Sequence, residues 1–296
     1  MNATFLTFIH VLSPLHAGTG QGIGVIDLPI AREKATNLPI FPGSSFKGTL
    51  RDVVGRQSPD LVDELFGTTG SADDSARAGA LMFSDFRLLC LPVRSLCGTF
   101  AWVTSPYILS RFKRDCDATG TPTSLAVPQI DETSCCVTAD TKLEYQSQPA
   151  ASVILEDLDV QIANRDATHW ANFIAKKVFS APEWQRMFQE RFCILSDNVM
   201  RFLAETATEV TARNRLQDDT KTTSPGALWY EEALPTETIL SGVLANAAPI
   251  DPQYISKIKE SVKAALQLGG HETVGRGLCR FIIDADGGRT NAVSNA

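Results

Sequence analysis

Short apolar runs typical of β-strands alternate along this chain with amphipathic helical segments, and the intervals between them are irregular. Residues 4–12 (TFLTFIHVL) form the first apolar run and residues 278–283 form the last. A parallel barrel would need strands and helices at regular spacing. The irregular alternation therefore favours an α+β fold, with a β-α-β-β-like core that long insertions elaborate.

The clearest helix is predicted to begin at Ser44 or Ser45, because either residue is a good N-cap. Apolar residues recur from Phe46 at i, i+4, i+7 and i+8, which places them on one face. Lys47 and Arg51 form a basic stripe beside that face. Hydroxyls, helix N-terminal N–H groups and two cations make an anion-binding surface. The alternative is an ordinary solvated basic helix face.

Residues 117–150 are the most loop-like stretch, because Thr, Ser, Pro and Gln dominate them. A segment of this length without its own secondary structure is usually functional or disordered. Residues 226–232 and 238–244 look like paired strands, and an amphipathic helix is expected over residues 255–266. The tail, residues 287–296, is expected to fray.

A glycine-rich element, residues 269–277 (GGHETVGRG), precedes the closing strand. Gly275 and Gly277 would let backbone N–H groups approach a phosphate closely, and Arg276 adds a positive charge. A tight turn between a helix and a strand is the alternative interpretation. Nowhere in the sequence is there the phosphate-loop pattern G-x-x-x-x-G-K-[ST], and the glycines at 18–24 do not match a dinucleotide-binding fingerprint.

The chain carries 34 acidic and 27 basic side chains, so its formal net charge is −7. This balance argues against an isolated nucleic-acid binder, since phosphate contacts require clustered Lys and Arg. Seven cysteines without a C-x-x-C pair fit neither a disulfide framework nor a zinc ribbon, so free, mostly buried thiols are expected. With no signal peptide and no apolar stretch of about 18 residues, we expect a soluble cytoplasmic protein.

The helix start and the glycine loop, taken with other motifs, make the sequence resemble the RAMP superfamily of CRISPR proteins. Within that superfamily it resembles the backbone (Cas7-like) subunits of type III-B (Cmr) effector complexes. The shared motifs run in order from about residue 6 to residue 283. They are residues 13–20 (SPLHAGTG), 27–33 (DLPIARE), 42–52 (PGSSFKGTLRD), 92–95 (PVRS), 103–106 (VTSP), 111–115 (RFKRD), 228–232 (LWYEE) and the glycine loop.

The resemblance implies a modified ferredoxin-like (RRM-like) core with long insertions, in which residues 1–286 form a single RAMP domain and residues 287–296 a tail. It also implies a thumb, a hairpin that projects into the guide–target duplex, and residues 117–150 are the expected candidate. The partners implied are a CRISPR guide RNA, a complementary target RNA, further copies of the chain and other Cmr subunits, with no membrane. The target RNA would be cut once per subunit.

The resemblance places the catalytic aspartate of the family on Asp27, with His16, Asp85 and either Glu231 or Glu232 as supporting residues. RNA cleavage by its own 2′-OH needs a deprotonated hydroxyl, an in-line phosphate and a stabilised leaving oxygen. A carboxylate is a poor base for an alcohol but a good ligand for Mg²⁺ or Mn²⁺, so a divalent metal on Asp27 is expected. The alternatives are that Asp85 interrupts a strand edge and that the glutamates are solvated.

RNA contacts would come from a local groove, while the remaining acidic surface would meet neighbouring subunits. The expected RNA-binding residues are Ser44, Ser45, Lys47, Arg51, Arg111, Lys113, Arg114, Gly275, Arg276 and Gly277.

Two other functions fit parts of the same pattern. One is a non-catalytic scaffold that only holds the guide RNA, and the other is a RAMP endonuclease that matures CRISPR transcripts. The presence of Asp27 favours the nuclease over the scaffold. The PGSSFKG helix start and the Trp-Tyr-Glu-Glu run argue against the maturation enzyme.

Overall fold

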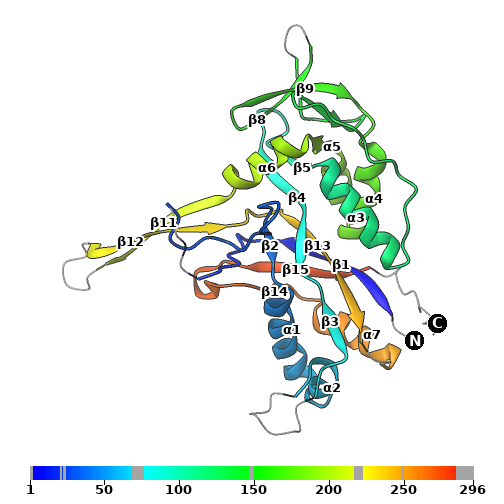
Figure 1. Cartoon of the computed structure of the whole chain (residues 1–296), viewed down its shortest axis with the longest axis vertical. Coiled ribbons are helices and arrows are strands. Elements are labelled where there is room, and N and C mark those ends of the chain that lie inside the picture. The colour runs from blue at the N-terminus through cyan, green and yellow to red at the C-terminus, as the bar shows by residue number, and fades with distance from the viewer. Residues whose placement is uncertain are drawn as a thin grey trace.

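The computed structural model describes residues 3–20, 22, 25–68, 77–146, 150–216, 223–247 and 250–284. Within them a thirteen-stranded, strongly curled sheet runs through the molecule, and a two-stranded hairpin projects from its side (Figure 1). The fold is therefore α+β, as the irregular alternation of strands and helices predicts. The predicted tail, residues 287–296, lies outside the described residues.

The main sheet has one continuous path of paired strands. In spatial order its strands are β14 (Leu266–Gln267), β15 (Leu278–Ile283), β1 (Thr4–Val11), β13 (Ile239–Asn246), β4 (Phe86–Arg94), β5 (Phe100–Thr104), β10 (Phe192–Leu195), β6 (Ser134–Val137), β9 (Leu158–Asn164), β8 (Ser152–Leu155) and β7 (Glu144–Tyr145). Two short strands lie off this path: β2 (Ile40–Phe41) pairs with β4, and β3 (Leu81–Phe83) pairs with β13.

The helices lie in two groups along this path, as Figure 1 shows. Near β14, β15 and β3 are α1 (Gly43–Gln57), a 3₁₀ turn η1 (Pro59–Leu61), α2 (Val62–Phe66) and α7 (Pro252–Ser261). Near the other half are α3 (Pro106–Ala118), α4 (Thr168–Val178), α5 (Pro182–Glu190) and α6 (Asp197–Thr206). The glycine loop contains a second 3₁₀ turn, η2 (Glu272–Val274).

The first strand lies in the middle of the sheet rather than at its edge. On one side β1 pairs antiparallel with β15, and on the other it pairs antiparallel with β13. Its apolar run explains this place, since residues 6–11 are all buried and a strand buried on both faces reads as a continuous hydrophobic run. The first and last strands predicted from sequence are thus confirmed and lie side by side.

Helix α1 packs an apolar stripe against this half of the sheet. Phe46 is fully buried, and its ring lies against those of Phe83, Phe86 and Phe281 at centroid separations of 4.5–5.4 Å. The predicted N-cap was wrong, because the helix begins at Gly43. A distant carboxylate caps it instead: Asp85 Oδ1 accepts from the Gly43 N–H at 2.9 Å.

The structure differs from the sequence prediction in one strand pairing and in the end of one helix. The strand pair expected at residues 226–232 and 238–244 does not form, because β13 already has β1 on one edge and β4 and β3 on the other. The earlier strand, β12 (Thr223–Ala233), instead pairs with β11 (Glu209–Leu216) in the projecting hairpin. The helix expected to reach residue 266 ends at Ser261, since the chain turns there to place Leu266 in β14.

Residues 117–150, the expected thumb, include two strands in their described part: β6 inside the sheet, and β7, which pairs with β8 as a short hairpin. Cys135 and Cys136 are fully buried in β6, which lies inside the sheet between β10 and β9. Upstream of β6, Lys113 and Trp170 donate to the Leu125 and Ala126 carbonyls and hold the extended chain against α3 and α4. The polar composition resembled a loop because much of the segment lacks regular secondary structure.

No helix among the described residues is both long enough and apolar enough to cross a membrane. All seven cysteines are free thiols, and six of them are buried, which agrees with the expectation from their spacing.

This burial predicts a selective pattern of thiol reactivity. Burial raises the pKa of Cys116 and Cys279 to about 12 and of Cys136 to about 11. Burial also raises the pKa of Cys90, and a hydrogen bond with Cys135 together with burial raises the pKa of Cys193. Because their pKa values are raised, these thiols stay protonated at pH 8. Only the thiolate reacts readily, so these groups should be slow to alkylate. Alkylation of the folded chain at pH 8, read by mass spectrometry, is expected to label Cys97 first. In urea all seven should react, and equal rates in the folded chain would contradict this pattern.

Candidate functional site

Three segments that are far apart in the sequence meet beyond the end of β1. The Leu12 N–H donates to the Leu278 carbonyl, and the Gly277 N–H donates to the Pro14 carbonyl at 2.9 Å. Leu15 exchanges hydrogen bonds with Leu234 just after β12. Pairing of β1 with β15 therefore brings the segment around His16, the glycine loop and the base of the hairpin together.

Two glycines of the loop are needed for this close approach, and a third is open. Gly269 has φ +71°, and a Cβ there would lie 2.3 Å from the His16 carbonyl oxygen. Gly277 has φ +78°, and a Cβ would lie 1.9 Å from the Leu268 carbonyl oxygen. Gly275 has φ +79° but no atom within 4 Å of its Cβ position, so a side chain there would meet open space.

A cavity of about 300 Å³ lies between the start of α1 and the glycine loop. Its lining includes His16, Ser45, Thr49 and Gly270. The structure thus brings together the two elements that sequence analysis singled out at opposite ends of the chain. A helix N-terminus, two hydroxyls and loop backbone converge here, which is a suitable environment for an anion.

The imidazole of His16 is buried at this cavity in a defined orientation. His16 Nδ1 lies 2.7 Å from the Glu232 carbonyl oxygen. A carbonyl can only accept, so Nδ1 carries the proton and Nε2 is left able to accept one. The His16 and His271 rings lie edge to face, with centroids 5.2 Å apart.

The segment that carries Asp27 lies along β12 like a short third strand of the hairpin. The Leu28 N–H donates to the Tyr230 carbonyl, and the Glu232 N–H donates to the Leu28 carbonyl, both at 3.0 Å. Asp27 Oδ2 accepts from the Tyr230 N–H at 2.7 Å. The Asp27 side chain is exposed, so a charged carboxylate is presented to solvent at the base of the projecting hairpin.

The neighbouring glutamates of β12 are both buried, and they differ in their partners. Glu231 has no exposed surface and lies among two guanidiniums and an imidazole: Arg276 Nε at 3.4 Å, Arg213 Nε at 3.5 Å and His271 Nε2 at 3.3 Å. These contacts are electrostatic, since neither Glu231 carboxylate oxygen has a hydrogen-bond partner among the described residues. Neither glutamate is solvated, which excludes the alternative considered from the sequence.

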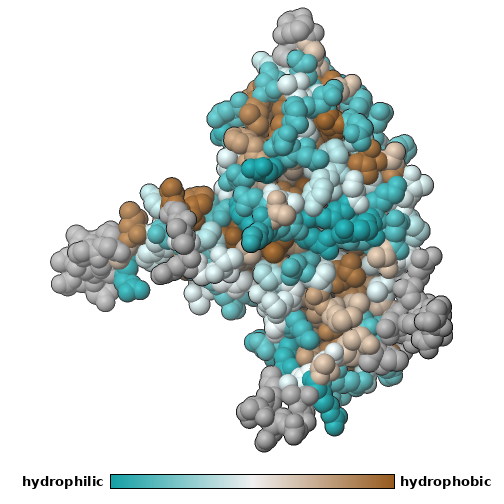
Figure 2. All heavy atoms as spheres, in the orientation of Figure 1, coloured by the Kyte–Doolittle hydropathy of each residue, from teal (hydrophilic) through white to brown (hydrophobic). Residues whose placement is uncertain are grey.

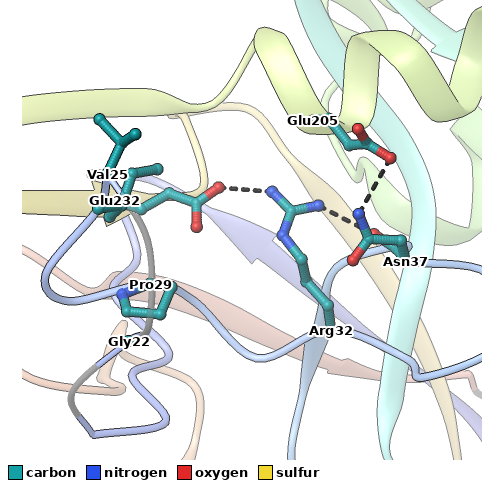
Figure 3. Close-up of a pocket in the computed structure, with 8 residues that line it drawn as sticks. Gly22, Val25, Pro29, Arg32, Asn37, Glu205 and Glu232 are labelled. Carbon is teal, nitrogen blue, oxygen red and sulfur yellow. Dashed lines mark hydrogen bonds and ion pairs between the residues drawn. The ribbon is translucent and has the colours of Figure 1, made fainter.

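Glu232 is 2% exposed and belongs to a network in which each carboxylate oxygen is hydrogen-bonded. Oε2 accepts from the Ile30 N–H at 3.0 Å, and Oε1 accepts from Thr208 Oγ1 at 2.9 Å and Arg32 NH2 at 2.5 Å. Figure 3 shows this ion pair continuing from Arg32 to Asn37 and Glu205, which line a pocket of about 360 Å³. The Asn37 amide donates to Glu205 and, with Arg201 nearby, lowers the pKa of that carboxyl.

Most cations predicted to contact RNA are used inside the protein. Arg111 is buried and its NH1 donates to both oxygens of Glu33 at 2.7 Å. Arg51 donates to the Gly67 carbonyl, and Lys113 is held by the Leu125 carbonyl. Arg114 is exposed and lies beside Asp115.

The remaining predicted residues lie at or near the start of α1 and in the glycine loop. Ser44 and Ser45 are exposed at the start of α1, with Lys47 one turn further on. Arg276 is buried, and its NH2 donates to Thr211 Oγ1 at 3.0 Å. Asp85 accepts from the Gly43 N–H and so caps α1.

No group of three or more His, Cys, Asp or Glu side chains in the described ranges could hold a metal ion by itself. Asp27 is a single exposed carboxylate. Mg²⁺ in phosphoryl chemistry commonly binds one or two carboxylates, several waters and substrate phosphate oxygens. The donor set therefore fits a metal that arrives with a phosphate, and not a site built by the protein alone.

Sequence reasoning missed Arg32, Thr208 and Arg213. Arg32 was inside a motif that had been noted, but nothing in the sequence indicated that it would reach Glu232. Thr208 and Arg213 carried no signal, because their role depends on the pairing of β11 with β12.

The chain is similar to several known proteins along nearly its whole length. Residues 8–280 match the RAMP superfamily. The "CRISPR system Cmr endoribonuclease Cmr4" of Pyrococcus furiosus is 33% identical over 293 residues, which cover 94% of this chain and 95% of the relative.

Two solved structures have the same fold. "Crystal structure of oligomeric Cmr4 from Pyrococcus furiosus" has a TM-score of 0.73 and 27% identity, covering 96% of this chain and 98% of that one. A chain of "Cryo-EM structure of the Type III-B Cmr-beta bound to cognate target RNA" has a TM-score of 0.73 at 21% identity, covering 95% of this chain and 96% of that one.

The glycine geometry makes a testable prediction about the loop. Gly277→Ala should lower the free energy of unfolding by more than 2 kcal/mol, roughly the cost of a left-handed residue plus a backbone clash, because its Cβ would collide with the Leu268 carbonyl. Gly275→Ala is the matched control, with the same sign of φ and open space, and should cost about 1 kcal/mol. Urea unfolding measures both, and equal losses would contradict the assignment of Gly277 to close packing.

Proposed function

The chain belongs to the RAMP superfamily, and from this we propose that it is the backbone subunit of a type III-B CRISPR effector complex. In this role copies of the chain assemble along a guide RNA and cleave complementary target RNA at regular intervals, one site per subunit. The observation that carries the proposal is the exposed Asp27 carboxylate, held on β12 at the base of a projecting hairpin. The full-length similarity to a Cmr endoribonuclease supports the same activity.

The strand order supports a ferredoxin-like core. The elements β1, α1, β4, β13, α7 and β15 follow the chain in a β-α-β-β-α-β sequence. Their four strands are adjacent in the order β15-β1-β13-β4, and each neighbouring pair is antiparallel. We assign the RRM-like core to these elements and treat the other half of the sheet as an insertion.

We assign the thumb to the β11–β12 hairpin, in place of residues 117–150. Figure 2 shows apolar side chains on this projection, and Val210, Leu228 and Tyr230 are exposed there. Exposed apolar and aromatic side chains on a projection suit insertion between stacked bases. The hairpin base carries Asp27, so a strand splayed by the hairpin would meet the carboxylate.

We place the guide-RNA backbone along the cavity between α1 and the glycine loop. The hydroxyl-bearing side chains Ser45 and Thr49 line this cavity, and Lys47 on the same helix adds a charge. Backbone amides and hydroxyls can bind phosphate without a large basic patch, which makes the site compatible with a net charge of −7.

In cleavage, the protein orients groups around the attacking 2′-OH. The Tyr230 N–H holds one oxygen of Asp27, and the neighbouring backbone pairing fixes the approach of the carboxylate. A divalent cation, Mg²⁺ or Mn²⁺, would be held by Asp27 with the scissile phosphate and would supply electrophilic polarisation. His16, with Nε2 able to accept a proton, lies on the cavity side and contributes to holding the RNA.

The nuclease is tested with the reconstituted effector complex, guide RNA and a labelled complementary target. Asp27→Asn keeps the size and an acceptor for the Tyr230 N–H but removes the charge. It should slow cleavage by about 10²- to 10⁴-fold, with target binding retained. EDTA should also remove the ladder of evenly spaced cuts. Tight target binding without cuts by the wild type would indicate the non-catalytic scaffold, and an undiminished ladder from Asp27→Asn would refute the role of Asp27.

Guide binding is tested at α1. Lys47→Glu should weaken binding of the guide RNA and reduce the slope of log affinity against log salt by about 1, as expected for a lost phosphate contact. Lys263→Glu reverses a charge of the same type on an exposed side chain after α7 and should leave guide binding unchanged. Filter binding across a salt series measures both. Equal effects of the two variants would remove α1 from the guide-binding surface.

A further inference from the structure

A second cavity lies on the segment that carries Asp27, apart from the cavity at the glycine loop. Its volume is about 360 Å³, and Ile26 and Pro29, which flank Asp27 in the sequence, form part of its lining. Ligand pockets in proteins commonly measure about 300–1,000 Å³, so a cavity at the low end suits a single nucleobase. Because the Asp27 side chain is exposed, a nucleotide whose phosphate reaches that carboxylate has the cavity beside it. We call this cavity the Arg32 pocket.

The Arg32 pocket has an apolar side and a polar side (Figure 3). Val25, which is 88% exposed, and Pro29 line the apolar side. Arg32 lies on the other side in this view, and its NH1 and NH2 groups already donate to acceptors of the protein. Those hydrogen bonds lie in the plane of the guanidinium, so a ring in the pocket can contact its flat face. Nucleobases stack on such faces.

The polar side also presents hydrogen-bond acceptors. The Asn37 side-chain amide donates to Glu205 Oε1 at 3.0 Å, and Arg201 Nε donates to the same oxygen at 3.2 Å. Glu205 Oε2 and Asn37 Oδ1 accept no hydrogen bond from the described residues, and both side chains line the pocket. The hydrogen bond from Asn37, with Arg201 and Arg32 nearby, holds the pKa of the Glu205 carboxyl below its usual value. At neutral pH the group is therefore a carboxylate, which only accepts.

The two carboxylates at the pocket do not exclude RNA. Glu232 is ion-paired with Arg32, and Glu205 is ion-paired with Arg201. The formal charges of these two pairs cancel, so an approaching nucleotide meets no net negative charge from them.

An exocyclic amino group complements the free acceptors of the pocket. Adenine and cytosine each carry one, and guanine carries one next to a ring N–H. Uracil instead presents carbonyl oxygens, which a carboxylate repels and cannot hydrogen-bond. Displacement of a base from the duplex frees this edge, since in a base pair the partner strand occupies it. The pocket is therefore suited to a displaced base that bears an amino group.

We propose that the Arg32 pocket receives the displaced base of the target RNA beside each cut and, through Glu205 and Asn37, favours guanine, adenine and cytosine over uracil. The inference deepens the proposed function and rests on it, since the hairpin must first displace the base. Holding the base fixes the adjoining ribose and phosphate beside Asp27, and the rate depends strongly on such placement. The preference therefore appears in the rate of cleavage.

The first arm of the test uses the reconstituted complex with target RNAs that differ at one displaced position, each with its matching guide RNA. The other cuts of the ladder are the control in the same lane. In single turnover, the cut beside an amino-bearing base should be about 10-fold faster than the cut beside uracil, the lower end of what a hydrogen bond to a charged group contributes. Glu205→Gln should reduce this ratio to less than about 2-fold by slowing the cuts beside amino-bearing bases.

A second variant tests the same pocket without straining the fold. Asn37 has φ +59°, a left-handed conformation that glycine adopts easily, and its carbonyl, which accepts from Arg32, remains in Asn37→Gly. This variant removes the amide that orients Glu205, so it should also lose the base preference. Glu260→Gln is the matched control, because Glu260 is an exposed glutamate paired with a cation three residues along the chain. It should keep the wild-type ratio.

A second readout follows the base without cleavage. In the complex with Asp27→Asn, a target carrying 2-aminopurine, which bears an amino group, is placed with this base at the displaced position. Its fluorescence should be quenched by acrylamide less than in the free strand, because the pocket covers the base. Adding Glu205→Gln should increase the quenching.

The outcomes distinguish this inference from the function it rests on. Equal wild-type rates beside all four bases would overturn the base preference, as would a preference that persists in both Glu205→Gln and Asn37→Gly. A displaced 2-aminopurine as open to acrylamide as in the free strand would overturn the pocket, whether or not the complex cuts. A wild-type complex that binds target RNA and never cuts it would overturn the proposed nuclease, while shielding that Glu205→Gln removes would still support the pocket.

Discussion

The rest of the structure depends on the place of β1 between β15 and β13. A first strand buried on both faces accepts neighbours from the end of the chain on both edges. Its exit then lies beside the glycine loop, and β13 leads back to the hairpin. The cavity at α1, the buried glutamates and the Asp27 segment therefore gather at one end of the same three strands. Without this pairing the motifs would remain far apart.

Two adjacent carboxylates are buried at the base of the hairpin, and they differ in how their charge is compensated. Glu232 has hydrogen bonds on both oxygens, whereas Glu231 neutralises part of the charge of Arg213 and Arg276 without a hydrogen bond. Glu209 also interacts with Arg276, so the two guanidiniums are balanced by two carboxylates.

Periodicity predicted the elements whose burial is simple. The first and last strands and the apolar face of α1 follow directly from local patterns. Pairing partners could not be predicted in the same way. Residues 226–232 read as a strand, but whether that strand joins β13 or leaves with β11 depends on which edges of β13 other strands occupy. The cap of α1 by Asp85 was hidden for the same reason, since it crosses 42 positions.

At the candidate site, residue type alone was a poor predictor of which side chains would be free to bind RNA. Arg111, Arg51 and Lys113 were expected to bind RNA because they are basic, yet each is committed to a carboxylate or a carbonyl of the protein. A basic side chain that forms an internal ion pair or hydrogen bond cannot be distinguished by its charge from one that binds a ligand. Both kinds occur beside apolar stripes in the sequence. Glycines are more specific. A residue such as Gly277, whose Cβ would overlap a backbone oxygen, can be explained only by a chain that must pass there. In this protein the backbone path around the glycine loop is the better guide to the proposed RNA-binding surface, and the surrounding charges serve mainly to hold that path in place.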